Sequence, residues 1–119
     1  MGMDESGIRF PAAEAEIESW LGNRASTRAV YEGLLELGLT PYPKTGIKHP
    51  RYVRWRDDRR GGPSIYLGTD SIDINKARYG HLVGGLPGAI EHSRDVKFMT
   101  DTPEGARRAL AAARITIGR

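Results

Sequence analysis

The stretch RYVRWRDDRRGGPSIYLGTDSIDI, residues 51–74, decides the fold class of this 119-residue chain. Apolar and polar residues alternate in it with a period of two, which is typical of a β-strand with one buried face. Val53 and Trp55 share one face of the first strand, and Ile65 and Leu67 share one face of the second. The turn-forming DDRRGGP lies between them, so the pattern predicts an antiparallel hairpin.

Further strands are predicted after the hairpin. In SIDI the apolar residues Ile72 and Ile74 fall on even numbers, whereas those of the preceding strand fall on odd numbers. A bulge or a turn is therefore expected within residues 68–71. Val96 and Phe98 alternate with polar residues in RDVKFM, which predicts another strand.

Helical periodicity flanks the strands. The segments 12–21 and 27–37 are predicted as an N-terminal helix pair, and 103–113 as a C-terminal helix. The proline-rich segment 41–50 is expected to be a loop, and ITIG, residues 115–118, a short last strand. Strands in a run with helices at both ends favour an α+β two-layer sandwich with a mostly antiparallel sheet of three to four strands.

Capping and core residues follow from the same patterns. Ser26 or Thr27 is suited to cap the second helix, and Thr102 the last one. The last helix should bury Ala106 and Ala113 on the stripe that also carries Leu110. The predicted core consists of Leu34, Trp55, Ile65, Leu67, Val96, Phe98 and Leu110.

Length and composition favour one small folded domain. Hydrophobic residues make up 39% of the chain and charged residues 28%, which is ordinary for a folded soluble protein. We expect a flexible tail over residues 1–10 and a single α+β domain over residues 11–119. The absence of cysteine excludes disulfides and thiolate metal sites. Without an apolar run of about 20 residues, we expect a cytoplasmic protein with no membrane partner.

Charge is unevenly distributed although the net charge is only +3. Residues 1–22 are acidic and residues 44–60 are basic. A chain polarised in this way can steer an anionic partner to one face. It can equally pair with a second copy, the acidic helix of one chain meeting the basic hairpin of another. A protein-interaction or self-associating domain is thus one alternative function.

Basic and aromatic side chains gather on the predicted outer face of the hairpin and in the loop before it. Arginine and lysine bind phosphate, and tyrosine rings stack on unpaired bases. Our leading prediction is a small non-catalytic binding module, without a cofactor, for an anionic partner and above all nucleic acid. A solvated hairpin with a polar outer face is the competing interpretation. The predicted binding residues are Lys44, Lys48, His49, Tyr52, Arg54, Arg56, Arg59, Arg60 and Tyr66.

A second alternative is an enzyme. The order of one helix, three strands, a helix and a closing strand resembles the core of restriction-endonuclease-like folds. That resemblance implies an acid on the second strand and an acid-x-Lys sequence on the third. Asp73 (or Asp70) and the pair Asp95 and Lys97 match these positions. Two carboxylates and a lysine in this arrangement would hold Mg²⁺ and orient water for phosphodiester cleavage.

Overall fold

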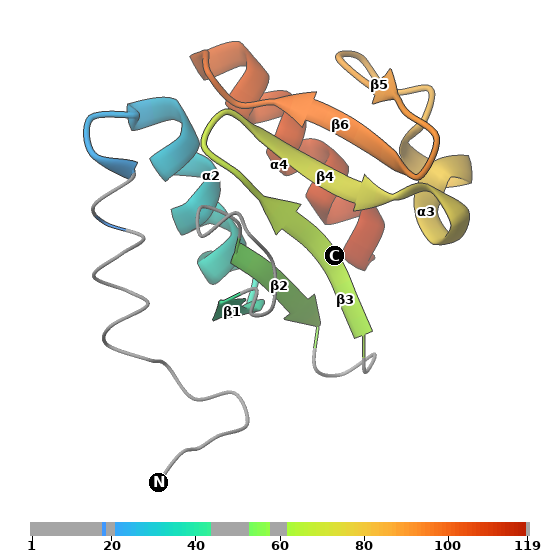
Figure 1. Cartoon of the computed structure of the whole chain (residues 1–119), viewed down its shortest axis with the longest axis horizontal. Helices are drawn as coiled ribbons and strands as arrows, with labels where there is room; N and C mark the ends of the chain where they lie inside the picture. The colour runs from blue at the N-terminus through green and yellow to red at the C-terminus, as the bar shows by residue number, and fades with distance from the viewer. Residues whose placement is uncertain (1–17, 19–20, 44–52, 58–61, 119) are drawn as a thin grey trace, which may run out of the picture.

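The computed structural model describes residues 18, 21–43, 53–57 and 62–118, and for residues 40–64 within these ranges it describes the backbone alone. Figure 1 shows the elements in chain order. They are α2 (Ala25–Glu36), β1 (Thr40–Pro43), β2 (Val53–Asp57), β3 (Gly62–Leu67), β4 (Ser71–Asn75), α3 (Lys76–Val83), β5 (Ile90–Glu91), β6 (Asp95–Met99) and α4 (Pro103–Ile117).

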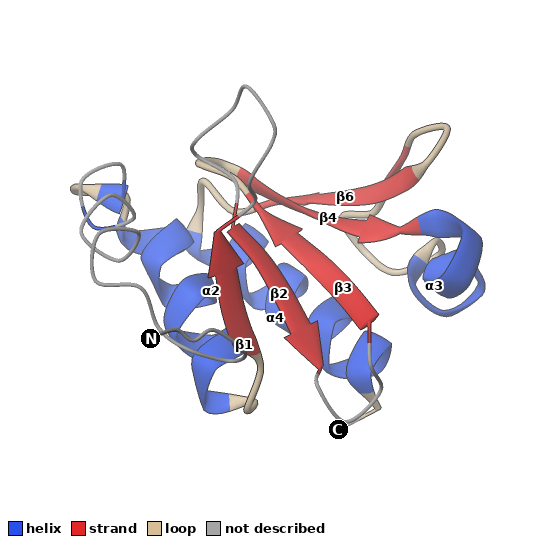
Figure 2. Cartoon of the chain, turned by 60° about the horizontal axis from the view of Figure 1, so that its bottom comes forward, coloured by secondary structure: helices blue, strands red, loops and turns tan. Residues whose placement is uncertain are grey.

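The strands form one antiparallel sheet in the order β1-β2-β3-β4-β6-β5. Helices α2 and α4 pack against each other on one face of this sheet (Figures 1 and 2). Helix α3 contacts α4 as well as β4 and β6, and its buried Tyr79 and Val83 belong to the same core. The α+β class with a helical layer on an antiparallel sheet is confirmed, and β1 and β5 widen the sheet beyond the predicted strands.

Strand register explains the core. Ile65 pairs with Ile74, and Ile74 pairs with Val96, so three strands contribute to one apolar row. A parallel row contains Leu67, Ile72 and Phe98. All of these side chains are at most 1% exposed. The change of parity between β3 and β4 is absorbed by a turn, in which the Gly68 N–H donates to the Ser71 carbonyl at 2.8 Å.

Helix α4 lies centrally behind the sheet, with contacts to β3, β6, α2 and α3. Its Thr102 cap is confirmed, because the Thr102 Oγ1 accepts from the Gly105 N–H at 3.0 Å. The predicted final strand is wrong. Ile117 follows Ala113 by one helical turn on the buried face, so burial of this stripe extends the helix through ITI. The buried face comprises Ala106, Ala109, Ala112, Ala113, Thr116 and Ile117.

Other sequence predictions have mixed outcomes. The predicted core residues on β3, β6 and α2 are buried, whereas Leu110 is half-buried and packs at the edge of the core. Segment 41–50 was predicted as a loop, but its start belongs to the edge strand β1. Helix α2 ends at Glu36, one residue before the predicted end, and Gly38 follows in the left-handed region at φ 88°. The side chain of Trp55, the tail 1–10 and most of the predicted helix 12–21 lie outside the described residues.

Candidate functional site

The candidate site is the outer face of the sheet. In the described part of the chain, the helices lie against the opposite face only (Figures 1 and 2). Strand register aligns one residue from each strand in a row that crosses this outer face. On β1, β2 and β3 the row consists of an aromatic, a charged and another aromatic residue. On β4 and β6 it continues with an acidic and a basic residue. In order, the row comprises Tyr42, Arg54, Tyr66, Asp73, Lys97 and Ile90.

Asp73 is the more buried of the two charged groups whose side chains are described in this row. Its side chain is only 12% exposed, and its Oδ1 is inaccessible to solvent. Removing a carboxylate from water is costly unless positive charge or hydrogen bonds compensate it. The Lys97 Nζ lies 3.8 Å from the Asp73 Oδ1, and the Lys97 side chain is 30% exposed. The two strands therefore place opposite charges side by side in the middle of the outer face.

The residues of the proposed metal site are only partly brought together. Asp95 pairs with Asn75, two residues along β6 from Lys97, so it is a diagonal neighbour of Asp73 on the same face. Diagonal neighbours on an antiparallel sheet are about 7–8 Å apart in their backbone positions. Two oxygens that each bind one Mg²⁺ at about 2.1 Å lie at most about 4.2 Å from each other, so both side chains would have to turn toward a shared ion. Within the described residues, no group of three or more histidine, aspartate or glutamate side chains is placed to hold a metal ion.

Two other features bear on that enzyme hypothesis. Asp70 lies in the turn between β3 and β4, where its Oδ1 is 3.9 Å from the Arg24 Nε. It thus faces the start of α2 rather than the carboxylates of β4 and β6. The closing strand of the restriction-endonuclease-like order is missing as well, because α4 continues through residues 115–117.

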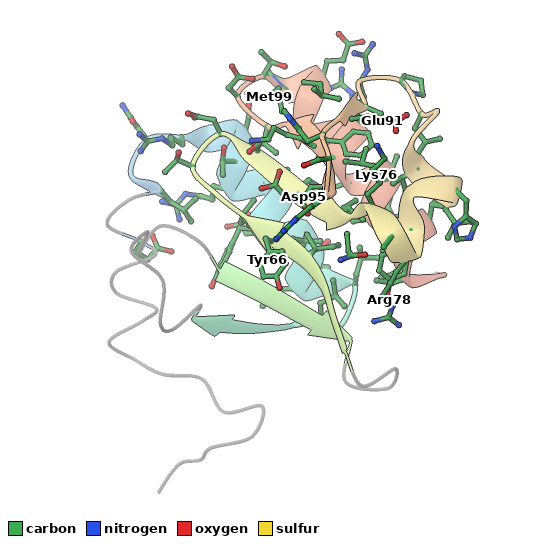
Figure 3. All side chains as sticks on the ribbon, turned by 45° about the vertical axis from the view of Figure 1, so that its right-hand side comes forward. Tyr66, Lys76, Arg78, Glu91, Asp95 and Met99 are labelled. Carbon is green, nitrogen blue, oxygen red and sulfur yellow. The ribbon has the colours of Figure 1, made fainter. Side chains whose placement is uncertain are left out.

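Several described cations at the far end of the sheet have partners within the chain. The Lys76 Nζ lies 3.2 Å from the Glu91 Oε1 and donates to the His92 carbonyl at 3.1 Å. The Arg78 guanidinium lies 5.3 Å from the centre of the Tyr79 ring, which is a cation–π contact. Figure 3 shows Lys76 and Arg78 at the α3 end of this face, away from Tyr66. An anion that binds the outer face would therefore draw its positive charge mainly from β2 and its hairpin.

The predicted binding residues are described to different extents. Arg54 and Arg56 lie on β2, and only their backbone positions are described. Tyr66 lies on β3 and its side chain is half-buried. The others, Lys44, Lys48, His49, Tyr52, Arg59 and Arg60, lie outside the described residues.

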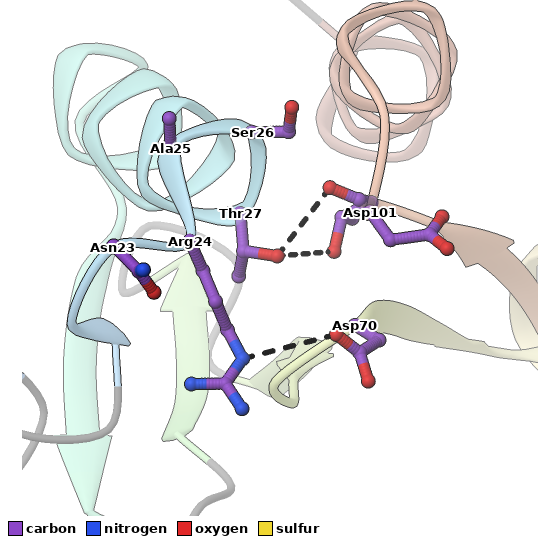
Figure 4. Close-up of a pocket in the computed structure, with 8 residues that line it drawn as sticks. Asn23, Arg24, Ala25, Ser26, Thr27, Asp70 and Asp101 are labelled. Atoms are coloured by element: carbon purple, nitrogen blue, oxygen red, sulfur yellow. Dashed lines mark hydrogen bonds and ion pairs between the residues drawn. The ribbon is translucent and has the colours of Figure 1, made fainter.

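A pocket of about 260 Å³ opens elsewhere, where the start of α2 meets the β3–β4 turn and the connection from β6 to α4 (Figure 4). At its base Thr27 is 1% exposed, and its hydroxyl donates to the Thr69 carbonyl at 2.7 Å. The same hydroxyl lies 2.8 Å from the Thr100 Oγ1. The lining residues are Asn23, Arg24, Ala25, Ser26, Thr27, Asp70, Thr100 and Asp101.

Thr27 was predicted as a helix cap, but it instead joins three distant segments. Helix α2 has no side-chain cap at its start, where Arg24 holds the capping position. The partners of Thr27 are 42 and 73 residues away in the sequence. No local pattern identifies such partners, which is why the sequence did not reveal this network.

Replacing Thr27 by valine is expected to lower the free energy of unfolding by about 1–2 kcal/mol, because it leaves the part-buried Thr69 carbonyl and the buried Thr100 hydroxyl without their hydroxyl partner. Thr116→Val is the matched control. Thr116 is also buried, but among the described residues its hydroxyl donates to the Ala112 carbonyl of its own helix, so a loss of about 0.5 kcal/mol or less is expected. Urea denaturation of both variants measures the difference, and equal losses would contradict a linking role for Thr27.

Comparison with models of known protein families, with curated proteins and with solved structures gives no match. Among the described residues, no helix is both long enough and apolar enough to cross a membrane.

Proposed function

We propose that this chain is a small non-catalytic binding module that takes a nucleic acid strand on the outer face of its sheet. One observation carries the proposal. The register places Arg54 beside Tyr66 in a single row across a face that the described helices leave uncovered. Tyrosine rings stack on bases and arginine binds phosphates, so these two residue types in one row of a sheet suit a nucleic acid strand.

The distribution of charged residues indicates how a nucleic acid strand would lie on the outer face. Arg54 and Arg56 lie on β2, and the hairpin that follows adds Arg59 and Arg60. The β4 and β6 part of the face carries Asp73, Asp95 and Lys97 and lacks this excess of positive charge. The phosphates would therefore follow β2 and its hairpin, and the bases would point toward β3 and β4.

A salt-titrated binding assay with single- and double-stranded DNA and RNA tests this proposal. We expect single strands to bind more tightly than duplexes, because stacking on Tyr66 requires unpaired bases. The logarithm of the affinity should fall linearly with the logarithm of the salt concentration, with a slope of about 0.7 per phosphate contacted on a single strand. Binding that does not depend on salt, or none at low salt, would favour the solvated hairpin instead.

A Mg²⁺-dependent nuclease is the second candidate, favoured by the 3.8 Å approach of the Lys97 Nζ to the Asp73 Oδ1 on the face that also carries Asp95. Asp73 and Asp95 would hold the ion, and Lys97 would stabilise charge that develops on phosphate. The same assay, run with Mg²⁺ and with a chelator, decides between the candidates. Strand cleavage that requires Mg²⁺ and is lost in Asp73→Asn would establish the nuclease, and intact strands would leave the binding module.

A further inference from the structure

Helices α2 and α4 leave a groove between them on the side of the helical layer that faces away from the sheet. The groove has a volume of about 340 Å³, and apart from Ser26 and Arg107 its lining is apolar. Ala25 and Ala29 of α2 are exposed along it, and Leu110 of α4 is half-buried. Covering such a surface with another apolar surface removes both from water and favours association.

Opposite charges border this groove. Glu32 and Glu36 are exposed on α2, one helical turn apart and on the helix face that carries the exposed alanines. Arg107 and Arg114 are exposed on α4, two turns apart on one face. Within the described part of the chain, none of these four side chains takes part in an ion pair. Their charges are therefore available to a partner that covers the groove.

The two helices run side by side in the same direction. Near their starts Ser26 and Pro103 line the same groove, and two helical turns later a Cβ at Gly33 would meet the Leu110 side chain. The acidic pair on α2 and the basic pair on α4 therefore lie at similar heights along the groove. A surface with acids along one side and bases along the other is complementary to a copy of itself turned by 180° about an axis parallel to the helices.

We propose that the chain forms a symmetric dimer through this helical face, which consists of the exposed sides of α2 and α4. The two-fold axis runs parallel to the helices, so α2 of each copy lies on α4 of the other. Glu32 and Glu36 of one copy then face Arg107 and Arg114 of the second copy, and the same contact occurs twice. The outer face of the sheet lies on the opposite side, so dimerisation neither covers it nor requires a nucleic acid (Figure 2).

Sedimentation equilibrium at low salt tests the dimer. We expect the mean mass to rise from that of one chain toward that of two as the protein concentration increases. Added salt should shift the midpoint to higher concentration, because it screens exposed charges. A mass of one chain at every concentration up to about 1 mM would overturn the proposal.

Two charge-reversal variants identify the interface. Glu32→Arg with Glu36→Arg makes the faces of both helices basic, and Arg107→Glu with Arg114→Glu makes both acidic. Each variant alone should dimerise at least about tenfold more weakly, because like charges meet at both contacts between α2 and α4. An equal mixture of the two variants should recover the dimer, since an acidic face then meets a basic face at both contacts. Native mass spectrometry identifies the mixed dimer by its mass.

Arg78→Glu with Arg94→Glu is the matched control. Both side chains are exposed and lie outside the groove, and their reversal changes the net charge by the same amount as reversal of Arg107 and Arg114. The control should keep the dissociation constant of the unmodified dimer within about threefold. Equal weakening by the two arginine pairs would contradict this interface. So would a mixture of the two charge-reversal variants that stays monomeric while the unmodified chain dimerises.

Discussion

Replacing Gly105 by alanine is expected to lower the free energy of unfolding by about 3 kcal/mol. An alanine Cβ at this position would lie 2.5 Å from the Met99 carbonyl oxygen and 3.3 Å from its carbonyl carbon. A short connection of residues 100–102 joins β6 to α4, so the first turn of the helix lies against the backbone of the last residue of β6, which is held by its strand pairing. Alanine favours a helix over glycine by only about 1 kcal/mol, and the overlap should outweigh this gain. Urea denaturation measures the net effect.

Gly33→Ala provides the control for that result. Its Cβ would lie 2.5 Å from the Leu110 Cδ2, which is as close as the contact at Gly105. The atom it meets is the end of a half-buried side chain that can change its rotamer. We therefore expect a change of less than about 1 kcal/mol, because the helix preference of alanine offsets the adjustment. Equal losses at the two glycines would contradict the argument that immobile backbone makes Gly105 costly.

The central part of the fold could be predicted because its signals are local. Alternation alone placed Ile65, Leu67, Val96 and Phe98 on one face, and the register of the sheet confirms it. Residues 115–117 were predicted as strand because ITI contains β-branched residues, which favour strands. In the structure the buried stripe of α4 outweighs this preference, since Ile117 completes the stripe at 1% exposure.

The edge strands and the site were harder to predict. Pro41 and Pro43 suggested a loop, yet proline is compatible with an edge strand, where β1 lies. The face on which Asp73 lies depended on how the turn at residues 68–70 absorbs the change of parity, and composition does not specify this. The turn places Asp73 opposite Tyr66 on one neighbouring strand and opposite Lys97 on the other.

Reversing Arg54 and Arg56 together to glutamate is expected to weaken binding of a single strand at low salt by at least about 100-fold. Under the proposed function, each replacement removes a positive charge that would bind phosphate and adds a repulsive one. A change of about 2.7 kcal/mol is a factor of 100. The salt dependence should become shallower by about 0.7 for each phosphate that the variant no longer neutralises. The melting temperature should change little, because the alternation of residues in β2 predicts both arginines on its polar face, where charged side chains contribute little to stability.

A matched pair of substitutions on another face distinguishes a loss of binding at the outer face from an effect of the changed net charge. Arg107 and Arg114 are exposed on α4, behind the sheet, and reversing both to glutamate changes the net charge by the same amount. If the outer face holds the strand, this second pair should lower the affinity far less than the first. Equal losses of affinity in the two pairs would mean that the protein attracts nucleic acid by its overall charge alone. In that case neither Arg54 and Arg56 nor the row through Tyr66 would form a binding surface.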